Sequence, residues 1–268
     1  MKKILSLALA AVMCVSLASC GSKKVNFAAK TSTMSAQLTE KYAQEYDSDI
    51  TYYEDSPTMY QAVMNGTNVA CYEDRSVIGW AIKEEGLALK TVGEIENPAE
   101  YGFAVKKGQN ADLVKMFNAG LANIKASGEY DEILAKYGYG DKTYKDETKE
   151  RVESGVTPSK KYVIYSDNAF APFEFLGEDN VYTGIDMDVL AAIAKDQGFE
   201  YEMHNEGFDA SMGAVQSGQA DAMIAGMTIT EERKNTFDFS DGYFEDGQIL
   251  VVPANSTATS INDLVKSK

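Results

Sequence analysis

The chain has 268 residues, of which 44% are apolar, so it is long enough for two domains and too apolar for a disordered protein. Its 41 acidic residues outnumber its 25 basic ones, and the resulting net charge of −16 would repel nucleic acid over most of the surface. Three cysteines and one histidine provide neither a disulfide framework nor a cluster of metal ligands, so we expect no metal and no other cofactor.

Residues 1–19 have the features of a secretory signal peptide: two lysines, an apolar stretch from Ile4 to Leu17, and then small residues. The apolar stretch is shorter than the roughly 20 residues that a membrane-spanning helix needs. Leu17-Ala18-Ser19-Cys20 resembles the bacterial lipobox, whose cysteine is acylated. We therefore expect residues 20–23 to form a lipid-anchored N-terminus, with Cys20 holding the protein at the bacterial cell membrane, outside the cytoplasm. An ordinary signal peptide with an incidental cysteine is the alternative.

Beyond residue 24, short β-branched or aromatic runs alternate with helical patterns, which predicts an α/β fold with largely parallel sheets. A period of 3.6 residues predicts helices around 113–124 and 130–137, and another helix is expected to begin at Asp186. Residues 141–160 are charged and lack an apolar stripe, which indicates a linker. The expected strands are Val25–Ala29, Val69–Tyr72, Tyr101–Val105, Tyr162–Tyr165, Ala222–Ala225 and Gln248–Val252.

Three long stretches resemble the polar amino-acid binding proteins that deliver ligands to ABC importers. They are YVIYSDNAFAPFEFLGEDNVYTGIDMDVLAAIA (162–194), FDASMGAVQSGQADAMIAGMTITEERKNTFDFSDGYFEDGQILVV (208–252) and YGFAVKKGQNADLVKMFNAGLANIKASGEYDEILAKYG (101–138). The resemblance implies the type 2 periplasmic-binding-protein fold: an α/β fold with two lobes, two hinge crossings and a ligand cleft between the lobes. It also implies a monomeric receptor with no enzymatic activity, whose partners are an amino acid, a permease and an ATPase.

The order of the matching stretches is inverted, because residues 101–138 resemble the C-terminal end of the family and yet precede the other two stretches. Residues 260–264 resemble the helix that opens lobe 2, and residues 25–29 resemble the next strand of that lobe. We therefore expect a circular permutation, with a fragment of a tandem array of receptors as the alternative. The expected parts are lobe 2 from 24–98 completed by 255–268, lobe 1 from 101–253, crossings near 98–101 and 253–256, and a permutation linker at 141–160.

Residues 225–233, AGMTITEER, are expected to hold the α-carboxylate of the ligand. Thr230 is a favourable N-cap, and Arg233, one turn into the helix that follows, can reach back to the cleft and bind a carboxylate bidentately. The resemblance gives this role to Arg233, adds hydrogen bonds from Thr228, and implies that the carbonyl of Gly226 receives the α-ammonium. The alternative for Arg233 is a surface arginine paired with a neighbouring acid.

Lobe 2 is expected to supply the remaining contacts to the amino and carboxyl groups. The resemblance matches Asp74 to the acid that pairs with the α-ammonium, while Glu73 is a rival because Arg75-Ser76 departs from the usual pattern. A solvated loop acid is the alternative. Thr33 and Met34 follow a strand and precede a helix, so backbone N–H groups there can complete an anion site, and both residues match family contacts.

Asp167, Phe170, Phe208 and Lys30 are expected to set the preference for the ligand's side chain. Asp167 ends the first lobe 1 strand, and the two phenylalanines match aromatic walls of the family, whereas Phe173 is assigned to the core. Lys30 matches a position that touches the ligand in some members, with a plain surface lysine as the alternative. A carboxylate and a lysine that face one side chain suit a neutral amide, so glutamine is the first expectation and a basic amino acid the second.

Two other functions are weighed against transport. Some proteins of this fold are dehydratases, but His204, the single histidine, offers no Ser/His/Asp or Cys/His arrangement and is expected at the surface. A receptor domain that presents its ligand to a membrane sensor would differ only in its partner. The lack of an evident transmembrane or kinase segment favours the importer.

Overall fold

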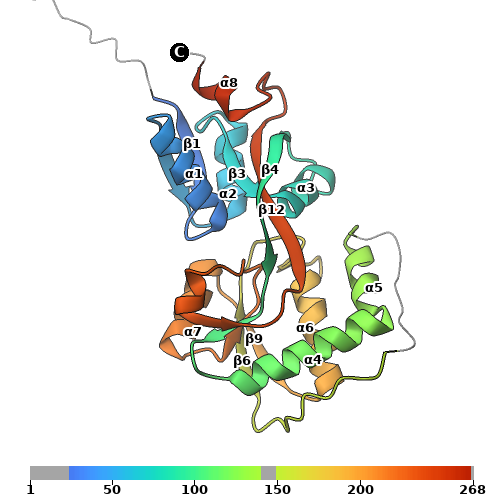
Figure 1. The fold of residues 1–268 in the computed structure, drawn as a ribbon. Coiled ribbons are helices and arrows are strands. Elements are labelled where there is room, and N and C mark those ends of the chain that lie inside the picture. Colours follow the sequence, from blue (N-terminus) through green and yellow to red (C-terminus); the bar gives the residue numbers. More distant parts are fainter. Residues whose placement is uncertain (1–23, 140–148, 267–268) are drawn as a thin grey trace, which may run out of the picture.

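The computed structural model describes residues 24–139 and 149–266, which form two lobes, each built around a five-stranded sheet (Figure 1). The signal peptide, residues 20–23 with Cys20, and residues 141–148 of the expected linker lie outside the described residues. We call the lobe at the N-terminal end of the described chain lobe 2 and the other lobe 1. The two-lobed α/β fold expected from the sequence is confirmed.

Lobe 2 has a sheet with helices on both faces. Its elements are β1 (Asn26–Lys30), α1 (Met34–Glu45), β2 (Asp49–Tyr53), α2 (Ser56–Met64), β3 (Cys71–Asp74), α3 (Arg75–Lys83), β4 (Leu89–Tyr101), β12 (Phe244–Pro253) and α8 (Ile261–Val265). The strand order is β2-β1-β3-β12-β4, in which β1 pairs parallel with β2 and β3 and β12 runs antiparallel to both neighbours. Along β12, Ile249 and Val251 pack with α2 and α3, whereas Leu250 and Val252 pack with α1 and α8.

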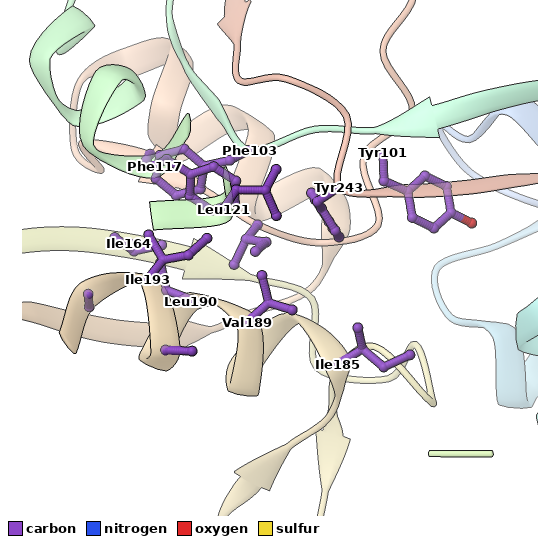
Figure 2. Close-up of a cluster of buried hydrophobic side chains, with 14 of the residues drawn as sticks. Tyr101, Phe103, Phe117, Leu121, Ile164, Ile185, Val189, Leu190, Ile193 and Tyr243 are labelled. Carbon is purple, nitrogen blue, oxygen red and sulfur yellow. The ribbon is translucent and has the colours of Figure 1, made fainter. Parts of the chain in front are cut away.

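Lobe 1 has the larger core. Its elements are β5 (Ala104–Lys106), α4 (Ala111–Ser127), α5 (Glu129–Lys136), β6 (Tyr162–Ser166), β7 (Phe175–Leu176), β8 (Tyr182–Thr183), α6 (Ile185–Gln197), β9 (Tyr201–Asn205), α7 (Phe208–Ser217), β10 (Ala222–Met223), the 3-10 helix η1 (Arg233–Asn235) and β11 (Phe237–Phe239). The strand order is β11-β5-β10-β6-β9, with β6 parallel to β9 and β10. Figure 2 shows Phe117 and Leu121 of α4 meeting side chains of α6 in this core. Gly120 allows the close approach of these helices, since a Cβ there would lie 2.7 Å from Cγ2 of Ile193.

The two segments that connect the lobes are hydrogen-bonded to each other (Figure 1). β4 leaves lobe 2 at Tyr101, and β12 enters it at Phe244, the residue paired with Tyr101 in register. The first crossing lies next to the expected position at 98–101. The second lies near Tyr243 and not at 253–256, because residues 248–253 belong to the lobe 2 sheet and not to lobe 1. A strand that is apolar on both faces fits either lobe, so its sequence does not show which sheet it joins.

The described part of the expected linker, residues 149–160, contains no helix or strand and lies against lobe 1. The side chain of Asn123 of α4 makes two hydrogen bonds to the backbone of Val152 in this segment. Nδ2 of Asn123 donates to the Val152 carbonyl at 2.9 Å, and Oδ1 accepts the Val152 N–H at 2.7 Å. The Arg151 guanidinium also donates to the Asp196 carbonyl of α6 at 2.6 Å. We call residues 149–160 the strap, because they tie the connection between α5 and β6 to the lobe surface.

Candidate ligand-binding site

A cavity of about 20 Å³ lies between the lobes, where β1, β3 and β6 end. This volume holds about one water molecule, so the lobes or the lining side chains must move apart to admit an amino acid. All the ligand-binding residues expected from the sequence line it, and Ala225 joins them. The lining residues are Lys30, Thr33, Met34, Asp74, Asp167, Phe170, Phe208, Ala225, Gly226, Thr228 and Arg233.

Arg233 spans the cleft from the lobe 1 side. It opens the short 3-10 turn η1 and not the expected α-helix, and its N–H donates to Oγ1 of Thr230 at 3.1 Å. Its guanidinium donates to the carbonyl oxygens of Thr228 and of Ser32 in lobe 2, both at 3.0 Å. Burial lowers the pKa of Arg233, but a guanidinium starts so high that it stays charged. Since it has five N–H donors, Arg233 keeps donors for a carboxylate.

Gly226 forms the adjoining wall in a conformation that requires glycine. Its φ is +52°, and a Cβ would lie 2.5 Å from Cε1 of Phe170. Its N–H donates to Oδ2 of Asp186 at 2.8 Å, which fixes the orientation of the peptide. The neighbouring Ala225 was missed in the sequence, because an alanine at the end of a buried run carries no signal beyond packing.

Asp74 and Glu73 point to different sides of β3, as neighbouring residues of a strand do. Asp74 lines the cavity, and its Oδ1 accepts from Nε2 of Gln248 at 2.6 Å. Burial, followed by the charges of Glu73 and Asp246, raises the pKa of Asp74 to about 8. Glu73 does not line the cavity, and its Oε2 accepts from the hydroxyl of Tyr60 at 2.8 Å. Of the two rival acids, the structure therefore places Asp74 at the site.

Thr33 and Met34 bring the N-terminal end of α1 to the cavity. Thr33 is the N-cap of this helix, because its Oγ1 accepts the N–H of Ala36 at 3.0 Å and donates to the Lys30 carbonyl at 2.8 Å. α1 begins at Met34 and has 12 residues, so its dipole favours a negative group at this end.

Lys30 and Asp167 form a buried ion pair across the cleft. Both are only 3% exposed, and Nζ of Lys30 lies 2.6 Å from Oδ2 of Asp167. Burial opposes the charge of Lys30 most strongly, but the Asp167 carboxylate outweighs it and holds the pKa of Lys30 above its ordinary value. The ammonium lies 5.0 Å from the ring centre of Phe170 and 5.9 Å from that of Phe208. Lys30 is therefore not a surface lysine, and Phe173, 0% exposed, belongs to the core.

The single histidine, which the sequence offered as a candidate catalytic residue, does not line this cavity. His204 lies on β9, where its ring stacks on Tyr165 and its Nε2 lies 3.1 Å from Oε1 of Glu202. The described residues contain no group of three or more His, Cys, Asp or Glu side chains able to hold a metal ion. None of the helices within 24–139 and 149–266 has the length and apolar character that a membrane span requires.

Comparison with known proteins identifies the relatives of this chain. Residues 162–266 match the model of the bacterial extracellular solute-binding proteins, family 3. The chain is 37% identical over 118 residues to a Neisseria gonorrhoeae protein named "Probable histidine-binding protein", a match that covers 44% of each chain. It is 37% identical over 112 residues to the arginine-binding extracellular protein ArtP of Bacillus subtilis, covering 41% of this chain and 44% of ArtP.

A third relative, the glutamine-binding protein GlnH of Bacillus subtilis, is 43% identical over 86 residues, which cover 31% of this chain and 32% of GlnH. The chain thus spans less than half the length of each of these relatives. The model of family 3 thus matches residues 162–266, and the described residues form a two-lobed α/β fold of the periplasmic-binding-protein kind.

Proposed function

We propose that this protein is an extracytoplasmic binding lipoprotein of an ABC importer, which captures a polar L-amino acid and delivers it to a permease and its ATPase. One observation carries the proposal: a single cavity combines a guanidinium, a separate carboxyl group and a buried ion pair, supplied by Arg233, Asp74 and Lys30–Asp167. The family match and the histidine-, arginine- and glutamine-binding names of the relatives support the same substrate class.

The two charges of an α-amino acid have matching partners in the cavity. The α-carboxylate binds the guanidinium of Arg233, with further donors from Thr228 and from the N-terminal end of α1 at Met34. The α-ammonium binds the Asp74 carboxylate and the carbonyl of Gly226. Because these groups come from both lobes, one ligand satisfies partners on each side of the cleft.

The side-chain end of the cavity favours glutamine. Nζ of Lys30 can donate to an amide oxygen, Asp167 can accept from the amide nitrogen, and Phe170 and Phe208 can enclose the aliphatic part. A neutral amide leaves the charges of the ion pair balanced, whereas a cationic ligand adds a third charge to a buried site. A basic amino acid is the second candidate, and it requires Lys30 to turn away from Asp167.

Closure of the cleft is proposed to trap the ligand. Three contacts cross between the lobes beside the cavity: Arg233 to the Ser32 carbonyl, Lys30 to Asp167, and Oγ1 of Thr31 to Oδ2 of Asp209 at 2.9 Å. A ligand that adds partners on both sides stabilises the closed form over an open one. In the proposed cycle the closed receptor docks on the permease, while acylated Cys20 keeps it at the membrane.

We also propose that the chain is a circular permutant of its family, with lobe 2 assembled from its first and last segments. In support, Ile261 of α8 packs in the same apolar cluster as Val25 and Phe27, and the hydroxyl of Tyr46 donates to Oδ1 of Asn262 at 3.3 Å. A chain rejoined by a short linker between residues 268 and 24, with new ends within 141–148, is expected to fold and to bind the same ligand. Failure of the rejoined chain to fold, with the original chain intact, would contradict the permutation.

Isothermal titration of the mature protein against the twenty amino acids tests the proposed function. Glutamine is expected to bind, and Arg233→Ala is expected to weaken it by at least about 2 kcal/mol, some thirtyfold, through loss of a buried charge partner. Lys234→Ala is the matched control, since Lys234 follows in the same turn, pairs with Glu231 and does not line the cavity. Equal affinity of the Arg233 variant and the control would refute the anchor. Recovery of an altered ligand would favour an enzyme.

A further inference from the structure

Beneath the cavity, two further acids lie side by side. Glu174 and Asp186 are both 0% exposed, and the N–H of Asp186 donates at 3.0 Å to the carbonyl of Phe173, the residue before Glu174, which brings the two acids together. Each carboxyl group acts on the pKa of the other. Oδ2 of Asp186 accepts the N–H of Gly226 at 2.8 Å and the hydroxyl of Tyr243 at 2.9 Å. No N–H or O–H donor among the described residues reaches Oδ1 of Asp186 or either carboxyl oxygen of Glu174.

A single proton removes one of the two charges and pairs two of the three oxygens. If both acids were ionised, two adjacent charges would be buried and three of their oxygens would lack donors, which is strongly unfavourable. If Glu174 is protonated, its O–H donates to Oδ1 of Asp186, and Asp186 becomes a carboxylate with three donors. The reverse assignment is poorer, because Asp186 already accepts two hydrogen bonds that favour its charged form.

The surrounding charges agree with a proton on Glu174. Burial raises the pKa of Glu174 well above its usual range, and the negative charges of Asp186 and Asp167 add to this, while the cation of Lys30 opposes it. Burial also raises the pKa of Asp186, to about 6, and the Gly226 N–H and the Tyr243 hydroxyl moderate the rise. At pH 7 the pair therefore holds one proton.

The pair connects two walls of the ligand cavity. Asp186 holds Gly226 directly. The backbone of Glu174 is paired with that of Phe170: the Phe170 N–H donates to the Glu174 carbonyl at 2.8 Å, and the Glu174 N–H donates to the Phe170 carbonyl at 3.2 Å. Neither acid lines the cavity, so both act through the residues they hold.

We propose that Glu174 is a neutral carboxylic acid in the folded protein and that its hydrogen bond to Asp186 positions the Gly226 and Phe170 walls of the ligand cavity. The assignment of the proton stands independently of the ligand. The consequence for affinity rests on the proposed function.

The proton is tested by unfolding in denaturant between pH 5 and 7, with Glu174→Gln as the variant. Glutamine is neutral and keeps an N–H donor for Asp186, so it mimics the protonated acid. Unfolded Glu174 releases its proton above about pH 4.3, so the unfolding constant of the unmodified chain should rise, relative to that of the variant, by about tenfold per pH unit. A ratio that stays constant with pH would overturn the proposal. An infrared difference spectrum at pH 7, unmodified chain minus variant, gives a second readout: the neutral C=O stretch of Glu174, with the signal of Asp74 cancelled because both proteins share it.

The positioning role is tested by titration with glutamine. Glu174→Gln should retain the affinity of the unmodified chain, whereas Glu174→Leu, which has no donor, should bind at least tenfold more weakly at pH 7. Equal affinities of the two variants would overturn the positioning role. If the unmodified chain binds no amino acid, the proposed function fails, and the unfolding experiment still decides where the proton lies.

Discussion

Replacement of Lys30 by methionine is the most informative perturbation of the ligand site. The change keeps the length and apolar stem of the side chain and removes the ammonium that faces Asp167 at 2.6 Å. Asp167 is 3% exposed, so without Lys30 its carboxylate is buried and unpaired. Two effects are expected, a loss of stability without ligand and a change of ligand preference.

The magnitude follows from the burial of both partners. Removal of one partner from a buried ion pair costs about 3–5 kcal/mol, and Lys30 and Asp167 are almost entirely buried. Because the cleft can open and hydrate Asp167, we expect a loss of stability near the lower limit, about 3 kcal/mol. A cationic ligand can then take the position of the lysine ammonium between Phe170 and Phe208. Lys30→Met should therefore bind arginine or lysine more tightly than glutamine, whereas the unmodified chain should prefer glutamine.

The assay combines urea unfolding with calorimetric titration of glutamine, arginine and lysine into each variant. Lys30→Arg, which keeps a cation at this position, is the control and should retain the preference for a neutral side chain. If Lys30→Met loses no stability and still prefers glutamine, the ion pair does not set the specificity, and the account of the side-chain end of the cavity is wrong.

Three further results are expected. Affinity for the ligand should rise up to tenfold per pH unit towards pH 8, because burial raises the pKa of Asp74 to about 8 and only ionised Asp74 pairs with an ammonium. In calorimetry, Asp74→Asn should flatten this pH profile. A flat profile in the unmodified chain would contradict the expected role of Asp74. Asp246→Asn should move the profile to lower pH by removing a negative neighbour of Asp74. Asn123→Ala should lower the stability of the folded protein by roughly 1–3 kcal/mol and speed tryptic cleavage in the strap, because both hydrogen bonds to Val152 are lost. Ser154→Ala is the control and should change little. Equal cleavage rates in the two variants would argue against the strap contacts.

The candidate site could be read from the sequence because its residues follow the ends of strands. Lys30, Asp74 and Asp167 stand at or just after the carboxyl ends of β1, β3 and β6, and such ends meet at one edge of each sheet. The roles came from the resemblance to a known family, and the structure adds that the residues share one cavity. The alternation of β3 then separates Asp74 from Glu73, which the loop pattern alone left open.

Other features depend on tertiary contacts that leave no local pattern. The apolar run at 248–252 fits a central strand of either sheet, and only pairing with β3 and β4 assigns it to lobe 2. Glu174 looks like a polar residue of a short strand, and Asp186 looks like a first-turn helix acid. Nothing in their spacing of 12 residues predicts that both are buried side by side.

The hydrogen bonding between the two connecting segments has a consequence for how the lobes move. Because Tyr101 and Phe244 are paired, the segments behave as one two-stranded ribbon and not as two independent tethers. A ribbon bends readily perpendicular to its plane and resists bending within the plane or shearing of one strand past the other. The lobes should therefore rotate about a single hinge axis. Arg233 and Asp74, one on each lobe, should then return to the same alignment at every closure.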